Sequence, residues 1–466
     1  MKLNTFLLTI VSALIMTSQS YAMDMQVQLM GDRFVDQLPV DWKKEQGLWE
    51  YFDITKCFTT PNAICFGNNP TSPYGFPAFI DPVTQLPSMN FQMNQKEAVV
   101  LIFRTPSQMR YFSFAQYLAA RPNSAELVFA SLSDSLNHLK LGTTGSNTKG
   151  VNVFDRYAAV VWTADVVTYE TAKDLLISSG LPEYTINFLP LPVNLPFTQL
   201  RMGHGSDKEQ FNMLMRTALP AVPASFDSYK EEKPFYVLKV GPSDLNNLNP
   251  SPVIGYQSEI SGVKENSNLQ AALNNLVSNI RLNYSSEYET TPQEVDFTNR
   301  TGWDCIENST SCFGDNHDAL YSKDTSLVRV KNLQDMVIIA GVNHQKTGKA
   351  IYINHSVYDL KKLAGIVTVS DPQLTTESAL YHAGIKDLRD PRALIYRQLY
   401  AYVISYDCQG KRFCLQIPAP TVDNPVGLPP GTPFFVVGRS YLEPRTKVRP
   451  FETEIIKHQV FIGSKK

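Results

Sequence analysis

Residues 65–74 read CFGNNPTSPY, and residues 312–321 read CFGDNHDALY. Cys, Phe, Gly, Asn and Tyr recur in register, and Asn68 stands where the second copy has Asp315. Glycine permits backbone conformations that other residues resist, and asparagine tolerates left-handed geometry while bonding its own backbone. We therefore interpret both stretches as the same turn, present once in each half of a duplicated chain.

Other segments recur in the same order after each copy of the turn, which is the signature of an internal repeat. Apolar runs rich in β-branched and aromatic residues predict strands at 97–104, 110–118 and 126–131, matched by strands at 335–341, 349–358 and 364–370. The stretches DKEQFNMLMRTAL and PRALIYRQLYAYV are predicted as matching helices, each preceded by a histidine, His204 and His382. The fold class is therefore predicted as mixed α/β (α+β), with two diverged tandem repeats related by pseudo-twofold symmetry.

The domain boundaries follow from this alignment. The first repeat domain is predicted at 23–285 and the second at 305–466, with a polar linker at 286–304. An insert at about 145–196 in the first repeat has a strand-helix-strand pattern, which favours parallel pairing. Its helix is predicted to begin with Thr168 as the N-cap.

The N-terminal residues 1–22 are predicted to be a signal peptide. Lys2 precedes the apolar run FLLTIVSALIM, and small residues end the segment at Ala22. The run is shorter than the roughly 20 apolar residues that a membrane-spanning helix needs. We therefore expect a secreted or periplasmic protein, with no membrane span in the mature chain and a monomeric state.

The six cysteines agree with export, because they fall into three close pairs, as local disulfides do in an oxidising compartment. Zinc binding is the alternative, but the spacings are wider than the usual Cys-x2–4-Cys. Proximity along the chain predicts the pairs Cys57–Cys65, Cys305–Cys312 and Cys408–Cys414.

Composition and motifs exclude several functional classes. Lys and Arg total 42 against 44 Asp and Glu, without a basic block, so we expect no nucleic-acid partner. The chain has no P-loop and no Gly-x-Gly-x-x-Gly, so no cofactor is predicted. The second repeat collects histidines near carboxylates, but none has His-x-x-x-His or His-Glu-x-x-His spacing, and no metal site is predicted; these residues are Asp315, His317, Asp318, His344, His355 and His382.

A serine nucleophile is a further alternative. Residues 131–137, SLSDSLN, resemble the Gly-Asp-Ser-Leu box of one esterase and lipase superfamily, with Ser135 in the place of the nucleophile. Ser133 replaces the glycine, and the expected Asp-x-x-His near the end of such a domain is missing. The resemblance therefore carries little weight.

His204 and His382 are the catalytic candidates, together with Asp207, because each histidine precedes a predicted matching helix. A histidine held by a carboxylate can act as a general base near neutral pH. The alternative is that each histidine only caps or packs at a helix start. The ligand-binding candidates are the cations of two equivalent turns, which could hold an anionic group; these are Arg104, Arg110, His344 and Lys349.

Two functions remain open for this exported, disulfide-stabilised chain. One is a hydrolase whose site lies in a cleft between the repeats, since domain interfaces favour ligand sites. The other is a non-catalytic binding protein for an anionic or carbohydrate ligand. In both cases the partner is an unidentified small molecule or polymer.

Overall fold

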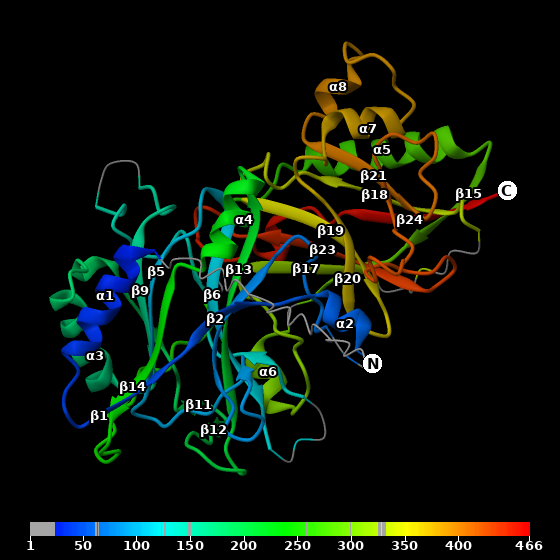
Figure 1. Cartoon of the computed structure of the whole chain (residues 1–466). Helices are drawn as coiled ribbons and strands as arrows, with labels where there is room; N and C mark the ends of the chain where they lie inside the picture. The colour runs from blue at the N-terminus through cyan, green and yellow to red at the C-terminus, as the bar shows by residue number, and fades with distance from the viewer. Residues whose placement is uncertain are drawn as a thin grey trace, which may run out of the picture.

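The computed structural model describes residues 24–466 except 61–62, 64, 123, 125–126, 148–150, 258–259, 299, 325–327 and 329–331. The predicted signal peptide at 1–22 lies outside these residues. The described chain is mixed α/β, as predicted, and helices lie at both ends of a stack of sheets as well as beside its middle (Figure 1).

The helices are short and several begin at a polar cap. Asp24 caps the first helix through two backbone N–H groups, and Thr301 and Asp304 form a capping box at the sixth. The helices are α1 (Met25–Asp36), α2 (Thr55–Thr59), α3 (Val166–Ser178), α4 (Pro223–Glu232), α5 (Asn268–Tyr284), α6 (Gly302–Glu307), α7 (Thr376–His382) and α8 (Arg392–Ile395).

The first half of the chain forms two sheets. Sheet I has the order β1-β14-β5-β9-β10, with strands β1 (Trp42–Gln46), β14 (Phe235–Pro242), β5 (Ala98–Arg104), β9 (Tyr157–Thr163) and β10 (Ile186–Pro190). Sheet II has the order β2-β3-β13-β6-β7, with strands β2 (Leu48–Tyr51), β3 (Tyr74–Ile80), β13 (Gln210–Pro220), β6 (Met109–Ala120) and β7 (Ala130–Ser131). Short strands β4 (Pro87–Ser88) and β8 (Leu136–Asn137) pair with sheet II, and β11 (Asn194–Leu195) pairs with β12 (Thr198–Gln199).

The second half forms two more sheets. Sheet III has the order β15-β24-β18-β21-β22, with strands β15 (Tyr288–Gln293), β24 (Gln459–Lys465), β18 (Met336–Val342), β21 (Leu399–Ser405) and β22 (Cys414–Gln416). Sheet IV has the order β16-β17-β23-β19-β20, with strands β16 (Val295–Thr298), β17 (Ala319–Asp324), β23 (Phe434–Tyr441), β19 (Tyr352–Asp359) and β20 (Ala364–Ser370).

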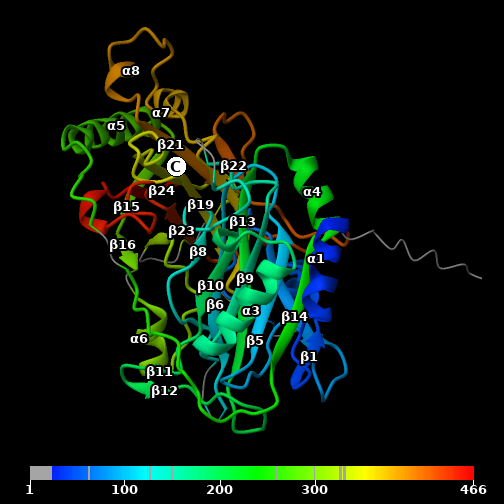
Figure 2. The same cartoon turned by 90° about the vertical axis from the view of Figure 1, so that its left-hand side faces the viewer.

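Successive side chains of the central strands point to opposite faces of their sheet. Each half therefore has one core between its two sheets and another between a sheet and its helices. In β5, Val99, Leu101 and Phe103 pack toward sheet II, whereas the residues between them pack under α1 and α3. Figure 2 views the face of sheet I that these two helices cover. In β18, Val337 and Ile339 pack toward sheet IV, and the alternate residues pack under α5 and α7. Each half is therefore a helix layer over two sheets.

The strand orders of the two halves correspond position by position. The short strands β4, β8, β11 and β12 are left out, and the remaining strands of each half are numbered in chain order. Sheet I then has the same strand order as sheet III, and sheet II has the same strand order as sheet IV. The edge pairs β9–β10 and β21–β22 are both parallel, whereas the other pairs in these four sheets are antiparallel. The sequence-predicted strands 97–104, 110–118, 335–341, 349–358 and 364–370 are confirmed as β5, β6, β18, β19 and β20.

Both predicted matching helices are wrong. The stretch after His204 is strand β13, and the stretch after His382 holds only the short α8 before strand β21. Both strands are buried on two faces: in β13, Met213 and Met215 face sheet I, while Leu214 packs with Tyr117 and Phe129 on the opposite face. Such a strand is apolar almost throughout, so its period cannot be told from that of a buried helix.

Two boundary predictions also change. Residues 286–304, predicted as a linker, contain β15 and β16, which are hydrogen bonded into sheets III and IV. The predicted insert at about 145–196 does contain a parallel strand-helix-strand unit, but its helix α3 is capped by Asp165 rather than Thr168. Sheet III has its own parallel edge pair, β21–β22, but no helix lies between these two strands as α3 lies between β9 and β10.

The three predicted disulfides are confirmed. Cys57–Cys65, Cys305–Cys312 and Cys408–Cys414 are bridged, with Cα–Cα distances of 5.9, 5.7 and 5.7 Å. The first two bridges lead directly into the repeated turns. Within the described part of the chain, no helix combines the length and the apolar character needed to cross a membrane.

Candidate functional site

The two repeated turns lie where sheets II and IV face each other, and each contacts the opposite half. Phe66 and Gly67 have φ angles of 52° and 66°, and Phe313 and Gly314 have 53° and 66°. The N–H of Gly67 donates to the carbonyl of Leu363 at 2.7 Å, and the N–H of Gly314 donates to that of Phe129 at 3.0 Å. Each copy of the repeated turn thus donates a backbone hydrogen bond to the opposite half.

The residue after each glycine makes the next contact. Asn68 Oδ1 accepts from the N–H of Gly365 at 2.8 Å, and Asp315 Oδ1 accepts from the N–H of Ser131 at 2.8 Å. A side-chain acceptor at this position satisfies a backbone donor of the opposite half. A Cβ on Gly365 would lie 2.6 Å from the carbonyl oxygen of Asn68, so glycine is required there.

Buried arginines complete the contacts of both turns. Arg216 of β13 donates to the carbonyl of Gly314, and Arg439 of β23 donates to that of Gly67 at 2.9 Å. The two side chains belong to residues that are only 4% and 5% exposed. Each guanidinium stacks near two tyrosine rings at 5.3–5.6 Å, Tyr74 and Tyr117 for Arg216, Tyr321 and Tyr358 for Arg439.

The remaining polar residues of the second turn are also bound across the interface. Asn316 Nδ2 donates to the hydroxyl of Tyr111 at 2.8 Å, and Asp318 accepts from Asn137 at 2.8 Å and from Tyr111 at 2.9 Å. Burial raises the pKa of Asp318 to about 7. These polar groups therefore act first as links between the halves.

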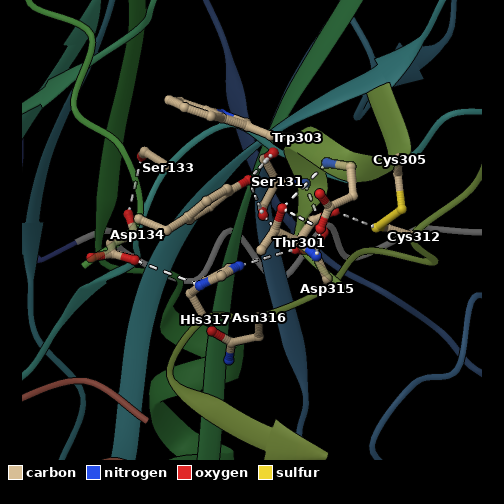
Figure 3. Close-up of polar contacts among 12 residues, drawn as sticks. Ser131, Ser133, Asp134, Thr301, Trp303, Cys305, Cys312, Asp315, Asn316 and His317 are labelled. Atoms are coloured by element: carbon tan, nitrogen blue, oxygen red, sulfur yellow. Dashed lines mark hydrogen bonds and ion pairs between the residues drawn. A yellow bond between two sulfur atoms is a disulfide. The ribbon is translucent and has the colours of Figure 1, made fainter. Parts of the chain in front are cut away.

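His317 is the centre of a polar cluster beside the second turn (Figure 3). Its ring stacks on Tyr256 with centroids 3.7 Å apart, and its nitrogens lie 3.8 Å from Asp134 and from Asp315. These distances exceed hydrogen-bond length. Burial, followed by the nearby Arg449, lowers the pKa of His317 to about 3, so its imidazole is neutral at physiological pH.

The cluster lacks the pairing that a serine hydrolase needs. Ser131 donates to Asp315 at 2.5 Å and contacts the Tyr256 hydroxyl at 3.0 Å, and it is 1% exposed. None of its contacts in the described residues is to a histidine. A nucleophile and its base should lie within about 2.6–3.2 Å. Ser135 is equally enclosed, because it donates to Asn316 Oδ1 at 2.9 Å and is 3% exposed.

Two hollows flank the repeated turns. The first hollow has a volume of about 110 Å³ and lies on sheet II, lined by Phe52, Met89, Ala119, Leu127, Phe129, Asn212 and Leu214. The second hollow has a volume of about 350 Å³ and lies on sheet IV, lined by Arg300, His317, Lys323, Tyr358, Phe435, Val437 and Arg449. Both hollows are also lined by one shared group of residues, Phe66, Gly67, Phe313, Gly314, Tyr321 and Arg439.

The second hollow is cationic. Arg300, Lys323 and Arg449 all line it, and the carboxylate that attracts Arg449 most strongly is Glu452. Lys323 lies over the ring of Phe435 at 5.0 Å, and Arg300 donates to Thr310. Asp315, the carboxylate in its lining, is fully engaged by Ser131, and burial raises its pKa. An anion could therefore be held there by charge and by aromatic faces together.

The predicted catalytic residues lie elsewhere. His204 is half-exposed and contacts Glu97 at 3.2 Å, whereas its predicted partner Asp207 pairs with Lys208 at 3.3 Å. His382 ends α7 rather than preceding a helix, and its Nδ1 accepts from Tyr284 at 2.8 Å while Nε2 donates to the carbonyl of Phe413. Burial lowers the pKa of His382 to about 4. The structure does not bring the two histidines together.

The predicted ligand-binding cations are mostly neutralised inside the chain. Arg104 pairs with Asp24, Asp155 and Glu232 at 2.5–3.1 Å, and Lys349 is buried between Glu443 and Glu454 at 3.0 and 2.8 Å. His344 contacts Glu265 at 2.8 Å. Arg110 is half-exposed and lies 3.9 Å from Asp371. These turns therefore lack the open cationic face that anion binding requires.

Neither a metal cluster nor a known relative points to another site. Within the described ranges, no three His, Cys, Asp or Glu side chains are grouped so as to hold a metal ion. No protein-family model matches the sequence, and no curated protein matches it.

Proposed function

We propose that this chain is a non-catalytic binding protein that holds an anionic small molecule in the second hollow. The observation that carries the proposal is the group formed by Arg300, Lys323 and Arg449, three cations that line the same hollow. Arginine forks and lysine ammonium groups are the usual protein ligands of carboxylate, sulfate and phosphate. Aromatic rings beside them suit a sugar or another flat face.

Binding is favoured over hydrolysis because the polar groups near the hollow are committed to structure. Asp315 is held by Ser131, Asn316 and Asp318 by Tyr111, and His317 is neutral and stacked. General acid–base catalysis needs a titratable group within hydrogen-bond reach of a reacting atom. The hydrolase hypothesis built on His204, Asp207 and His382 gains no support from their separate surroundings.

The proposal includes an origin by duplication and a location outside the cytoplasm. Equal strand orders and the reciprocal contacts of the repeated turns support two diverged repeats related by a pseudo-twofold axis. Three disulfides support folding in an oxidising compartment, as a secreted or periplasmic protein would experience. A hollow between two repeats is a common place for a ligand.

Ligand titration tests the proposal. Dissociation constants for butyrate, glucuronate and glucose 6-phosphate are measured by ligand-observed NMR, with glucose as the uncharged control. We expect at least one anion to bind more tightly than glucose and Arg449→Gln to weaken that binding at least tenfold. Arg389→Gln, which removes the same charge at a 91% exposed side chain, should leave it unchanged. Equal binding by Arg449→Gln and wild type would refute the proposal.

A further inference from the structure

We propose that the first hollow receives an apolar part of the same ligand, so that the natural ligand is an anionic amphiphile. The inference rests on the proposed function, because the second hollow supplies the anion site. It adds the chemical class of the ligand, a charged head with an apolar chain or ring. Five observations support it: the lining, the mouth, the shared wall, the charge of the two hollows and a buried acceptor without a partner.

The lining of the first hollow is apolar and rigidly placed. Phe129 and Leu214 lie on or beside the strands of sheet II and are 8% and 5% exposed. Met89 and Ala119 add further apolar surface. The volume of about 110 Å³ approaches the roughly 150 Å³ of an engineered apolar cavity that binds benzene. The space therefore suits one ring or a short length of acyl chain.

Large apolar side chains gather at the mouth of this hollow. Phe52, Leu127 and Phe313 all line it and remain 36%, 42% and 43% exposed. Apolar side chains scattered singly over a surface need no explanation, but a group around a cavity marks a binding surface. Burying these rings and the leucine against a ligand would remove apolar area from water, which favours binding.

The two hollows share one wall and differ in charge. Phe66 and Phe313 of the repeated turns line both, so a ligand could lie across the turns with one end in each hollow. The charged residues lining the first hollow are Arg216 and Arg439, whose guanidinium groups already bond the turn carbonyls. The second hollow adds Arg300, Lys323 and Arg449. Charge complementarity therefore places the head in the second hollow and the apolar part in the first.

A polar atom in the first hollow fits the same picture. Asn212 is 1% exposed, and its Nδ2 donates to Asn90 Oδ1 at 2.8 Å. Its Oδ1 has no hydrogen-bond partner within the described part of the chain. A buried acceptor without a donor costs free energy. A hydroxyl or amide N–H on the apolar part of the ligand would satisfy it.

A chain-length series tests the inference on the intact protein. Dissociation constants of n-alkyl carboxylates from butyrate to decanoate are measured by ligand-observed NMR with wild type, Leu127→Glu and Leu282→Glu. We expect affinity to rise about fourfold per methylene until the hollow is filled. Leu127→Glu places a charge at the mouth and should abolish this gain. Leu282→Glu, at a 73% exposed site on α5, should behave like wild type.

Each outcome separates the two claims. If butyrate binds through Arg449 but chain length has no effect in wild type, the amphiphile inference is wrong and the proposed function stands. If the gain with chain length survives in Leu127→Glu, the chain lies outside the first hollow and the inference is also wrong. If no carboxylate of the series binds but glucuronate or glucose 6-phosphate does, only the amphiphile inference is wrong. If no anion binds, the proposed function fails together with it. The wild-type series decides the matter even if Leu127→Glu does not fold.

Discussion

Arg216 and Arg439 each donate a hydrogen bond to the turn of the opposite half, Arg216 to the carbonyl of Gly314 and Arg439 to that of Gly67. Each guanidinium lies near two tyrosine rings of its own half, one from the turn and one from a strand of the sheet that faces the interface. The interface between the halves is thus closed by two equivalent buried cations. Each cation ties one copy of the turn sequence to the opposite half.

Removing either arginine should destabilise the protein to a similar degree. Arg216→Ala and Arg439→Ala each leave a buried carbonyl without its donor and a cavity between tyrosine rings, so we expect a loss of about 3 kcal/mol in the free energy of unfolding. Urea unfolding measures it. Arg389→Ala, at an exposed site, should change stability by less than about 0.5 kcal/mol. A similarly small effect at Arg216 and Arg439 would show that the cations do not hold the halves together.

Gly365 should not tolerate a side chain. In Gly365→Ala the new Cβ would lie 2.6 Å from the carbonyl oxygen of Asn68 and from Pro70 Cγ, so we expect a loss of about 1–3 kcal/mol. Gly255→Ala is the control, because its Cβ would meet nothing closer than 3.6 Å. The two variants are compared by thermal and urea unfolding. Equal stability of both would mean that the turn and β20 are less tightly packed than described.

Asp318 should make the protein less stable as pH rises toward neutrality. Its pKa is about 7 in the folded protein against 3.8 for an ordinary aspartate, so the folded state binds more protons between these values. Stability therefore falls by up to about 1.4 kcal/mol per pH unit in this window. Asp318→Asn should remove that slope and be more stable than wild type at pH 8. A variant less stable than wild type at pH 8 would contradict the assignment.

Buried histidines should make the protein sensitive to acid. Burial lowers the pKa of five of them below 6.5. The pKa falls to about 4 for His138 and His382 and to about 3 for His317 and His458, and that of His355 falls well below its ordinary value. The unfolded chain binds protons at these groups first, so stability is lost as pH falls from about 6.5 toward 4.

The expected slope is up to about 1.4 kcal/mol per pH unit for each histidine, reduced by Asp318, whose effect has the opposite sign. Free energies of unfolding at pH 7.5, 6 and 5 measure it. His382→Gln keeps a donor for the carbonyl of Phe413. It should reduce the number of protons taken up on unfolding by one, and the slope of stability against pH should fall accordingly. Constant stability between pH 7.5 and 5 would show that the histidines are not held neutral.

The sequence alone predicted the disulfides, the repeated turn and most strands around it, because these depend on local spacing and β-branched runs. It failed at β13 and β21, since strands buried on both faces carry no alternation to distinguish them from helices. It also misplaced the matching histidines, because that match depended on the wrong helices.

The site residues were harder to predict because they come together from distant segments. Lys323 lies on β17 and Arg449 follows β23, and nothing local marks them as neighbours. Arg216 and Arg439 did leave a signal: each is a lone arginine inside an apolar run, MLMRTAL and VVGRSYL. A charge in a strand with buried neighbours must have a buried partner, and that reasoning would have found the interface.

A crystal structure of the protein grown with decanoate tests the central claim most directly, because it locates the anion. We expect the carboxylate in the second hollow, within about 3 Å of Arg449 or Lys323, with the chain running across Phe66 and Phe313 toward Leu214. Decanoate bound anywhere else, with the second hollow free of it, would contradict the claim that this hollow is the anion site.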